Sequence, residues 1–365
     1  MDKFYAVLIA HCALVFFLLQ LVHYSLLFFA AHFVERIAVA VTCLVITLIT
    51  FRFTKRWCLQ DEIDIKKKAV LITGCDSGFG YLLAQRLDKK GFKVFASCLF
   101  PCGAGASELK TSLSENSKVF GLDVTKQESV QQALKYVKEN LGSYDLWAVV
   151  NNAGVRKGFS MELSSIQDFE DCVNVNSLGH VRITKTFLNL LRPSKGRIIN
   201  VNSISSRFPI PDIIPYCMSK FAAAGFNDCL REELGDTGIK VISMEASAFL
   251  SQMTETDIIK KSWEEKIAEN EDEIRKNRGE HYIENNRKLS KLYIENVSKD
   301  IHIVINDLEN AICCQYPDSI YDTSPNIFQV MCLKIQACLP PFIQDFFYHT
   351  VSQILLKFYR FKKTF

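Results

Sequence analysis

Two side chains four positions apart, Tyr216 and Lys220, form a pair that can move a proton. On a helix this spacing places both side chains on one face, about one turn apart. A nearby ammonium lowers the pKa of a phenol, because a positive charge favours the phenolate. A tyrosine that ionises more easily can act as general acid or base near neutral pH. Ser203 precedes Tyr216 at the end of the apolar run 197–201, and can meet that helix across a short loop.

The surrounding elements are needed to interpret this pair as a functional site, because a lone Tyr-x-x-x-Lys also fits an ordinary amphipathic helix. From residue 68 onward, short apolar runs alternate with helix-like segments. This alternation predicts a parallel sheet with helices on both faces. We therefore predict an α/β fold with a doubly wound parallel sheet of the Rossmann type, which binds ligands at the carboxyl ends of its strands. The predicted strands are 69–73, 93–97, 118–122, 146–150, 197–201 and 239–243, with helices near 80–87, 127–140, 167–191 and around Tyr216.

A glycine-rich turn, Thr73-Gly74-Cys75-Asp76-Ser77-Gly78-Phe79-Gly80, follows the first predicted strand. Glycines permit a tight turn and close approach of a pyrophosphate, which then lies at a helix N-terminus. Asp123-Val124 ends the third predicted strand, and Asn151-Asn152-Ala153-Gly154 ends the fourth. Both fall on the same sheet edge as the turn. Each motif alone fits an ordinary turn, but together they predict a dinucleotide site.

The N-terminal region predicts a membrane anchor over residues 1–56, with one or two hydrophobic segments. Residues 4–33 are almost wholly apolar, and a second run covers 37–51. A bilayer span needs about 20 such residues. A cleaved signal peptide fits less well, because the run is long and no small-residue cleavage site follows. Basic residues after the second run (Arg52, Lys55, Arg56 and 66–68) place the remainder in the cytosol by the positive-inside tendency.

The C-terminal third predicts a helical extension over residues 251–365, after a core at 68–250. Residues 252–300 are rich in Glu, Lys and Asn, and fit either a solvated helical insertion or a mobile lid over the substrate. The aromatic and basic tail suits a membrane surface. Lys362 and Lys363 stand where a dilysine retrieval signal would, which predicts the endoplasmic reticulum membrane with the catalytic domain facing the cytosol.

Composition excludes other classes of function. The net charge is +3 and no Lys/Arg-dense block carries interleaved aromatics, so we expect no nucleic-acid partner. Thirteen cysteines lack paired Cys-x-x-Cys spacing, so we expect no metal site and a reducing compartment.

Four motifs in order resemble the short-chain dehydrogenase/reductase family over about residues 68–250, and within it the membrane-bound hydroxysteroid and retinol dehydrogenases. They are the segments 73–80, 146–154, 196–201 and 216–221. The resemblance implies that Tyr216 is the acid/base and that Lys220 lowers its pKa and holds the nicotinamide ribose. It also implies that Ser203 hydrogen-bonds the reacting oxygen, and that Asn176 holds a water relaying protons to Lys220. The implied cofactor-binding residues are Gly74, Asp76, Ser77, Gly78, Phe79, Gly80, Asp123, Val124, Asn152, Ala153, Gly154, Tyr216 and Lys220.

Three departures and absences qualify this resemblance. The strand end 97–100 has no Arg or Lys for a 2′-phosphate, and Asp76 would repel one, so NAD is favoured over NADP. Asn202 replaces the first serine of the family's usual pair. Ala246-Ser247 stands where the family has Pro-Gly, with Ser251 at the following Thr. That turn supports the nicotinamide carboxamide, so its loss would loosen cofactor binding, alter substrate geometry or mark a protein without catalysis.

The resemblance implies a membrane-anchored NAD-dependent oxidoreductase that interconverts a lipophilic alcohol, such as a steroid or retinoid, and its carbonyl. Phe249 and Leu250 fit an apolar substrate side, or simply the core. One alternative is a 3-hydroxybutyrate dehydrogenase-like enzyme, which would need a cationic residue for the substrate carboxylate. Another is a non-catalytic NAD-binding membrane protein. By family analogy we expect a homodimer.

Overall fold

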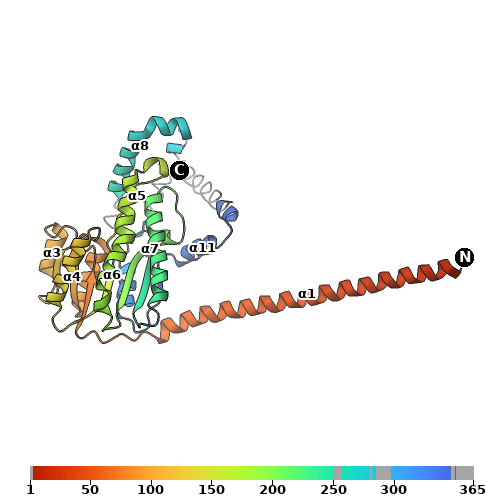
Figure 1. Ribbon diagram of the computed structural model, residues 1–365. Helices are drawn as coiled ribbons and strands as arrows, with labels where there is room; N and C mark the ends of the chain where they lie inside the picture. The colour runs from red at the N-terminus through yellow and green to blue at the C-terminus, as the bar shows by residue number, and fades with distance from the viewer. Residues whose placement is uncertain (1–2, 250–255, 280–281, 285–296, 347–349, 351–365) are drawn as a thin grey trace, which may run out of the picture. The chain divides into compact units, whose positions relative to one another are not determined.

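A computed structural model describes residues 3–249, 256–279, 282–284, 297–346 and 350. The chain divides into two compact units, Met1–Asp61 and Glu62–Phe365 (Figure 1). Leu250, Ser251, Lys362 and Lys363 lie outside the described residues. The finer division at residue 250 stays a prediction.

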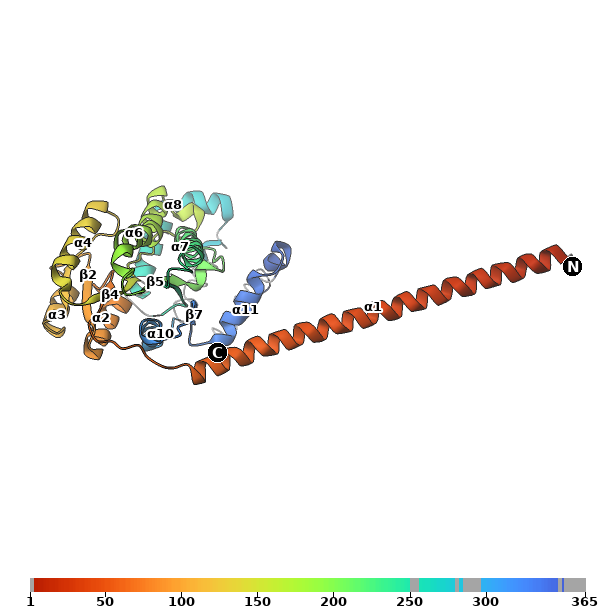
Figure 2. The same cartoon turned by 60° about the horizontal axis from the view of Figure 1, so that its bottom comes forward.

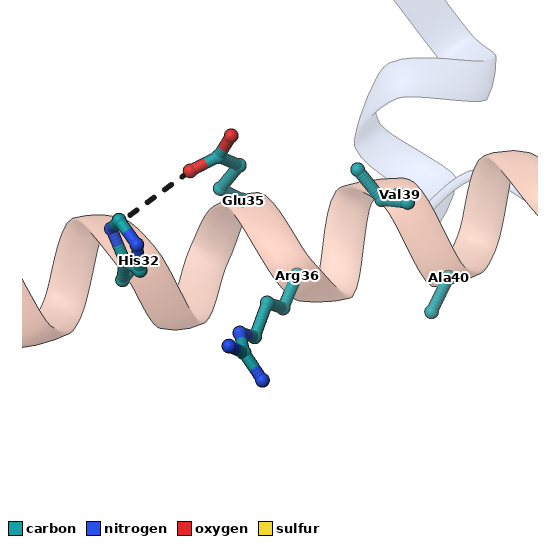
Figure 3. A pocket seen from close by; sticks show the side chains of 5 residues that line it. All are labelled: His32, Glu35, Arg36, Val39 and Ala40. Carbon is teal, nitrogen blue, oxygen red and sulfur yellow. Dashed lines mark ion pairs between the residues drawn. The ribbon is translucent and has the colours of Figure 1, made fainter.

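The first unit is one continuous helix, α1 (Lys3–Cys58). Its apolar part, Ile9–Phe51, is 43 residues long and is apolar enough to cross a membrane. At 1.5 Å per residue it extends about 65 Å, roughly twice the hydrocarbon thickness of a bilayer. The helix continues through Glu35 and Arg36, which lie close to His32 on its surface (Figure 3). His32 Nδ1 is 4.0 Å from Glu35 Oε2.

The second unit is built on a seven-stranded parallel sheet in the order β3-β2-β1-β4-β5-β6-β7. The order reverses between β1 and β4, which is where doubly wound sheets bind ligands. The six predicted strands are confirmed, and β7 is an addition at the far edge. The bounds are β1 Lys68–Ile72, β2 Lys93–Cys98, β3 Lys118–Gly121, β4 Asp145–Asn151, β5 Arg197–Ser203, β6 Lys240–Ala246 and β7 Ile320–Thr323.

Helices cover both faces of the sheet, as Figure 2 shows. One face packs on α2 (Gly78–Lys90), α3 (Ala104–Ser112) and α10 (His302–Cys313). The other packs on α4 (Gln127–Leu141), α6 (Gly179–Leu191) and α7 (Ile214–Glu233). Buried β-branched and aliphatic strand residues meet the apolar helix faces, so each side has its own core. The predicted doubly wound fold is therefore confirmed.

A buried arginine ties α10 to the sheet. Arg197 on β5 is 1% exposed, and its two terminal nitrogens donate to the carbonyls of Ala311 and Cys314 at 2.6 Å each. Its guanidinium lies 4.8 Å from the ring centre of Trp147. These carbonyls end α10, so the cation satisfies groups that the helix leaves unpaired.

The predicted helix at 167–191 is interrupted. It consists of α5 (Ile166–Val173), a π-helical segment η2 (Asn174–Leu178) and α6. A capping box at Ser165 and Asp168 begins α5. Single π turns inside helices frequently mark functional sites, and this one contains Asn176.

Candidate active site

Lys220 and Tyr216 lie on α7 against the carboxyl end of β5. Lys220 is 4% exposed, and its Nζ donates to the Val201 carbonyl at 2.8 Å. The same Nζ lies 5.7 Å from the ring centre of Tyr216. Burial lowers the pKa of Lys220 from 10.5 to about 8. The structure therefore brings together an ammonium and a phenol, as their spacing predicts.

Ser203 ends β5 and begins the 3₁₀ segment η3 (Ile204–Ser206), which packs against α7. Its Oγ accepts hydrogen bonds from the Ser205 hydroxyl at 2.9 Å and from the Ser205 amide at 3.3 Å. Because both are accepted, the hydroxyl hydrogen of Ser203 can point toward a substrate oxygen. Sequence reasoning missed this orienting role for Ser205, since two residues in one short turn give no periodic signal.

Asn176 joins the loop after β4 to α7. Its side-chain oxygen accepts from the Val155 amide at 2.8 Å, while its nitrogen donates to the Val155 carbonyl at 2.8 Å and to Ser219 Oγ at 2.9 Å. The residue is fully buried. The structure therefore places Asn176 beside the helix that carries Tyr216 and Lys220, with its side chain bonded to Val155 and Ser219.

The glycine turn forms the cradle that a dinucleotide requires. Gly74 has a φ of +70°, and a Cβ there would lie 2.8 Å from Ala153 Cα. A Cβ on Gly80 would lie 2.5 Å from both Asn152 Nδ2 and the Gly74 carbonyl oxygen. Asn152 Nδ2 in turn donates to the Thr73 and Gly74 carbonyls at 2.8 and 2.9 Å. The ends of β1 and β4 are thus held together at the switch point.

Helix α2 begins inside this turn at Gly78 and has no acidic residue in its first turn. Its amide groups and dipole are therefore suited to an anion. Ser77 stands at the N-cap position, and Phe79 packs edge to face on Phe249 with ring centres 6.3 Å apart. The cradle and the helix N-terminus fit the pyrophosphate of a dinucleotide.

Asp76 links the turn to the loop after β2. Its two carboxylate oxygens accept from the amides of Leu99 and Phe100 at 2.9 Å each. The carboxylate therefore lies at the end of β2, where the adenosine ribose of a dinucleotide would be read.

Asp123 and Val124 lie at the same edge. One oxygen of Asp123 accepts from the Thr125 amide at 2.9 Å and from the Thr125 hydroxyl at 2.6 Å. Val124 is 7% exposed, and a Cβ on Gly179 would lie 2.9 Å from its Cγ2. The close approach of α6 at Gly179 therefore fixes the position of Val124.

The Ala246-Ser247 departure lies between β6 and β7. Ala246 pairs in register with Thr323, and the Ser247 amide donates to the Thr323 carbonyl at 2.9 Å. The preceding residue, Glu245, has a side chain that is 1% exposed and lies between Arg207 Nε at 2.8 Å and Lys334 Nζ at 3.3 Å. Lys334 belongs to α11 (Ile327–Ala337) and also pairs with Asp322.

Helix α8 (Thr256–Arg278) is not a fully solvated insertion. Trp263, Ile267 and Ile274 are buried with Phe159 and Leu163 of the loop after β4. Arg278 Nε also lies 3.0 Å from Glu162 Oε1. Phe249 is 1% exposed, so of the two positions expected for it, the substrate side or the core, it occupies the core. Helix α8 thus covers the loop segment η1 (Met161–Leu163), whereas Phe249 serves packing.

Comparisons with known proteins agree with this geometry. The sequence model of a family described as short chain dehydrogenase matches residues 68–262. An estradiol 17-beta-dehydrogenase 2 from Rattus norvegicus is 39% identical over 72% of this chain and 69% of its own length. A mitochondrial D-beta-hydroxybutyrate dehydrogenase from the same organism is 36% identical over 70% and 76%. A retinol dehydrogenase 16 from Homo sapiens is 36% identical over 70% and 80%.

The matched residues contain the glycine cradle, the buried Lys220 and the serine and asparagine beside it. With the match to more than half of the chain, they show that this protein is an oxidoreductase of the short-chain dehydrogenase family, in which alcohols are oxidised at CH–OH.

Proposed function

We propose that this protein is a membrane-anchored, NAD-dependent dehydrogenase that interconverts a lipophilic alcohol of the steroid or retinoid class and its carbonyl. The observation that carries the proposal is Lys220, a buried cation 5.7 Å from the Tyr216 ring. The names of the estradiol and retinol dehydrogenases above support the substrate class. The apolar cover formed by α8 over η1 supports it too, because such a cover excludes water.

The reaction divides between cofactor and chain. A bound nicotinamide would supply the acceptor for the hydride of the alcohol carbon. Tyr216 Oη takes the hydroxyl proton, and the positive charge of Lys220 favours the phenolate that does so. Ser203, oriented by Ser205, donates a hydrogen bond to the reacting oxygen. Asn176 fixes the Val155 loop against α7.

The cofactor site is proposed from the turn and its neighbours. Gly74, Gly78 and Gly80 admit the pyrophosphate, while Ser77 and Phe79 flank it at the start of α2. Asn152, Ala153 and Gly154 border the path to the nicotinamide, and Asp123-Val124 borders the adenine. NAD is preferred over NADP because the Asp76 carboxylate lies at the Leu99 and Phe100 amides, where a 2′-phosphate would meet its negative charge.

The cellular placement is also a proposal. We infer an endoplasmic reticulum membrane protein whose catalytic unit faces the cytosol, supported by α1 and by the basic residues that follow its apolar part. A homodimer is supported by apolar side chains that remain about half exposed on η2 and α7, namely Leu178, Met218 and Phe221. Proteolysis of sealed microsomes should digest Glu62–Phe365 without detergent, and the mass in detergent should be twice that of one chain.

The deciding experiment supplies membranes containing the protein with NAD or NADP and a panel of steroids, retinol and 3-hydroxybutyrate. Tyr216→Phe should lower turnover by about 100-fold or more, since a positioned acid/base contributes about 10² to 10⁴. Its control is Tyr136→Phe on α4, which should keep full activity. Turnover that survives in Tyr216→Phe would refute the assignment. Cofactor binding without turnover across the panel would favour the non-catalytic reading.

One observation favours a second candidate, a dehydrogenase of a short hydroxy acid. Arg156 follows the Asn-Ala-Gly segment after β4. Burial raises the pKa of the Cys217 thiol, and the charge of Arg156 opposes that rise. Because Arg156 follows the segment that borders the proposed path to the nicotinamide, it is the cation that we assign to a substrate carboxylate. Arg156→Leu should abolish 3-hydroxybutyrate turnover and spare steroid or retinol turnover if this candidate is right.

A further inference from the structure

A buried carboxylate on β6, Glu245, lies at the centre of a polar network beside Ser203. Its side chain is 1% exposed. One of its oxygens, Oε1, accepts from Arg207 Nε at 2.8 Å and from Ser243 Oγ at 3.4 Å. Glu245 also pairs in register with Asn202 of β5, the residue that precedes Ser203. The carboxylate therefore occupies the strand position that adjoins Ser203.

The network holds the chain on both sides of Ser203. Before it, Asn202 Nδ2 donates to Ser243 Oγ at 2.9 Å, and Ser243 Oγ donates in turn to Glu245. After it, Arg207 closes the 3₁₀ segment η3 and binds Glu245 directly. Asn202 and Ser243 are buried, where hydrogen bonds are stronger than in water. The turn that carries Ser203 therefore begins and ends on groups linked to one carboxylate.

Arg207 joins this turn to the helix that carries Tyr216. Its Nη1 and Nη2 donate to the two carboxylate oxygens of Asp228 on α7, at 2.6 and 3.1 Å. A planar guanidinium held by two such hydrogen bonds is fixed in orientation as well as in distance. Helix α7 runs without interruption through Tyr216 and Asp228. Arg207 therefore restrains the Ser203 turn relative to Tyr216.

We propose that Glu245 is a positioning residue for Ser203, which it holds through Arg207 and Ser243 at the distance from Tyr216 that the reaction requires. This inference rests on the proposed function for its consequence, because Ser203 and Tyr216 must reach the same alcohol oxygen. A misplacement of about 1 Å can cost about 100-fold in rate. Because Arg207 keeps its bonds to α7 when Glu245 is lost, we expect a smaller loss of about tenfold.

The test uses the full-length protein in detergent, with NAD and with estradiol and retinol from the panel above. Glu245→Leu should lower kcat about tenfold and change the KM for the alcohol less than about twofold, because a misplaced Ser203 loses transition-state stabilisation. Glu245→Gln keeps an oxygen that accepts from Arg207 and Ser243, and should restore kcat to within about threefold of the parent. Lys334→Met is the matched control. Lys334 Nζ lies 3.3 Å from the other oxygen of Glu245, so this variant should lose stability and keep kcat.

A Ser203→Ala background shows whether the effect passes through Ser203. In that background, Glu245→Leu should lower the residual single-turnover rate by less than about twofold, because residues that act through one another are not additive. A full tenfold reduction there would overturn the proposal. An unchanged kcat in Glu245→Leu alone would overturn it too.

Amide hydrogen exchange tests the restraint without turnover. The peptide that covers residues 203–209 should exchange about tenfold faster in Glu245→Leu than in the parent, Glu245→Gln or Lys334→Met. Arg207→Met replaces Glu245→Leu if the latter does not fold. Equal exchange in all four proteins would overturn the proposal. The expected difference in exchange, in a protein whose parent form oxidises neither alcohol, would instead refute the proposed function alone.

Discussion

Replacing Lys220 with methionine is expected to stabilise the protein while abolishing its activity. The pKa of this buried lysine falls from 10.5 in the unfolded chain to about 8 in the folded one. That difference corresponds to about 3 kcal/mol of lost stability at any pH below 8. Methionine removes the buried charge but leaves the Val201 carbonyl without its donor, at a cost of about 1 kcal/mol. The net gain is about 2 kcal/mol.

The stability advantage of Lys220→Met over the parent should decrease as the pH rises. Between pH 8 and 10.5 the folded chain has lost the Lys220 proton while the unfolded chain retains it, so the stability of the parent rises with pH. The advantage of Lys220→Met should therefore be full at pH 7 and shrink by pH 10. The assay is thermal unfolding in detergent without cofactor at both pH values, with Lys240→Met on the exposed end of β6 as control. A variant less stable than the parent at pH 7, or an advantage independent of pH, would refute the reasoning.

Two further substitutions test the contacts of the C-terminal segments. Arg197→Met should destabilise the unit by about 2–4 kcal/mol in a denaturant titration, because the Ala311 and Cys314 carbonyls lose their charged donor inside the core; unchanged stability would show that α10 does not depend on this cation. Lys334→Met should cost about 1–3 kcal/mol and speed proteolysis within α11, because among the described residues the buried Glu245 then keeps only Arg207 as a cation. If α11 is cleaved at the same rate in the parent and in Lys334→Met, the expected role of Lys334 is contradicted.

Most of the sheet was predictable from local patterns. The buried strands β1, β2, β4, β5 and β6 are apolar runs, and the residues between them carry helical spacing. Strand β7 was missed because Ile320–Thr323 is short and contains Asp322, and its pairing with Ser243–Ala246 is set by distant parts of the chain. The π turn at Asn174–Leu178 was also missed, since it preserves the apolar face on either side.

The nearness of Tyr216 and Lys220 was predictable because they are one helix turn apart, so that spacing alone brings them together. The hydrogen bond from Ser205 to Ser203 was not, because it forms in a short 3₁₀ turn that no local pattern records. The continuity of α1 through Glu35 and Arg36 was not predicted either. Helix propagation across two charged residues needs only ordinary propensities, whereas the apolar pattern shows two runs.

The contacts at Ala246 and Ser247 bear on whether this chain has given up catalysis. In a Pro-Gly turn the proline ring restricts φ, and the glycine permits a positive φ. Ala246 and Ser247 have neither property. Here the Ser247 amide is held by the Thr323 carbonyl, and Thr323 Oγ1 donates to Asp307 of α10 at 2.6 Å. The C-terminal segments therefore restrain the position that the turn would otherwise fix. The retained restraint on Ser247 favours a different way of holding the loop after β6 over decay of the proposed site.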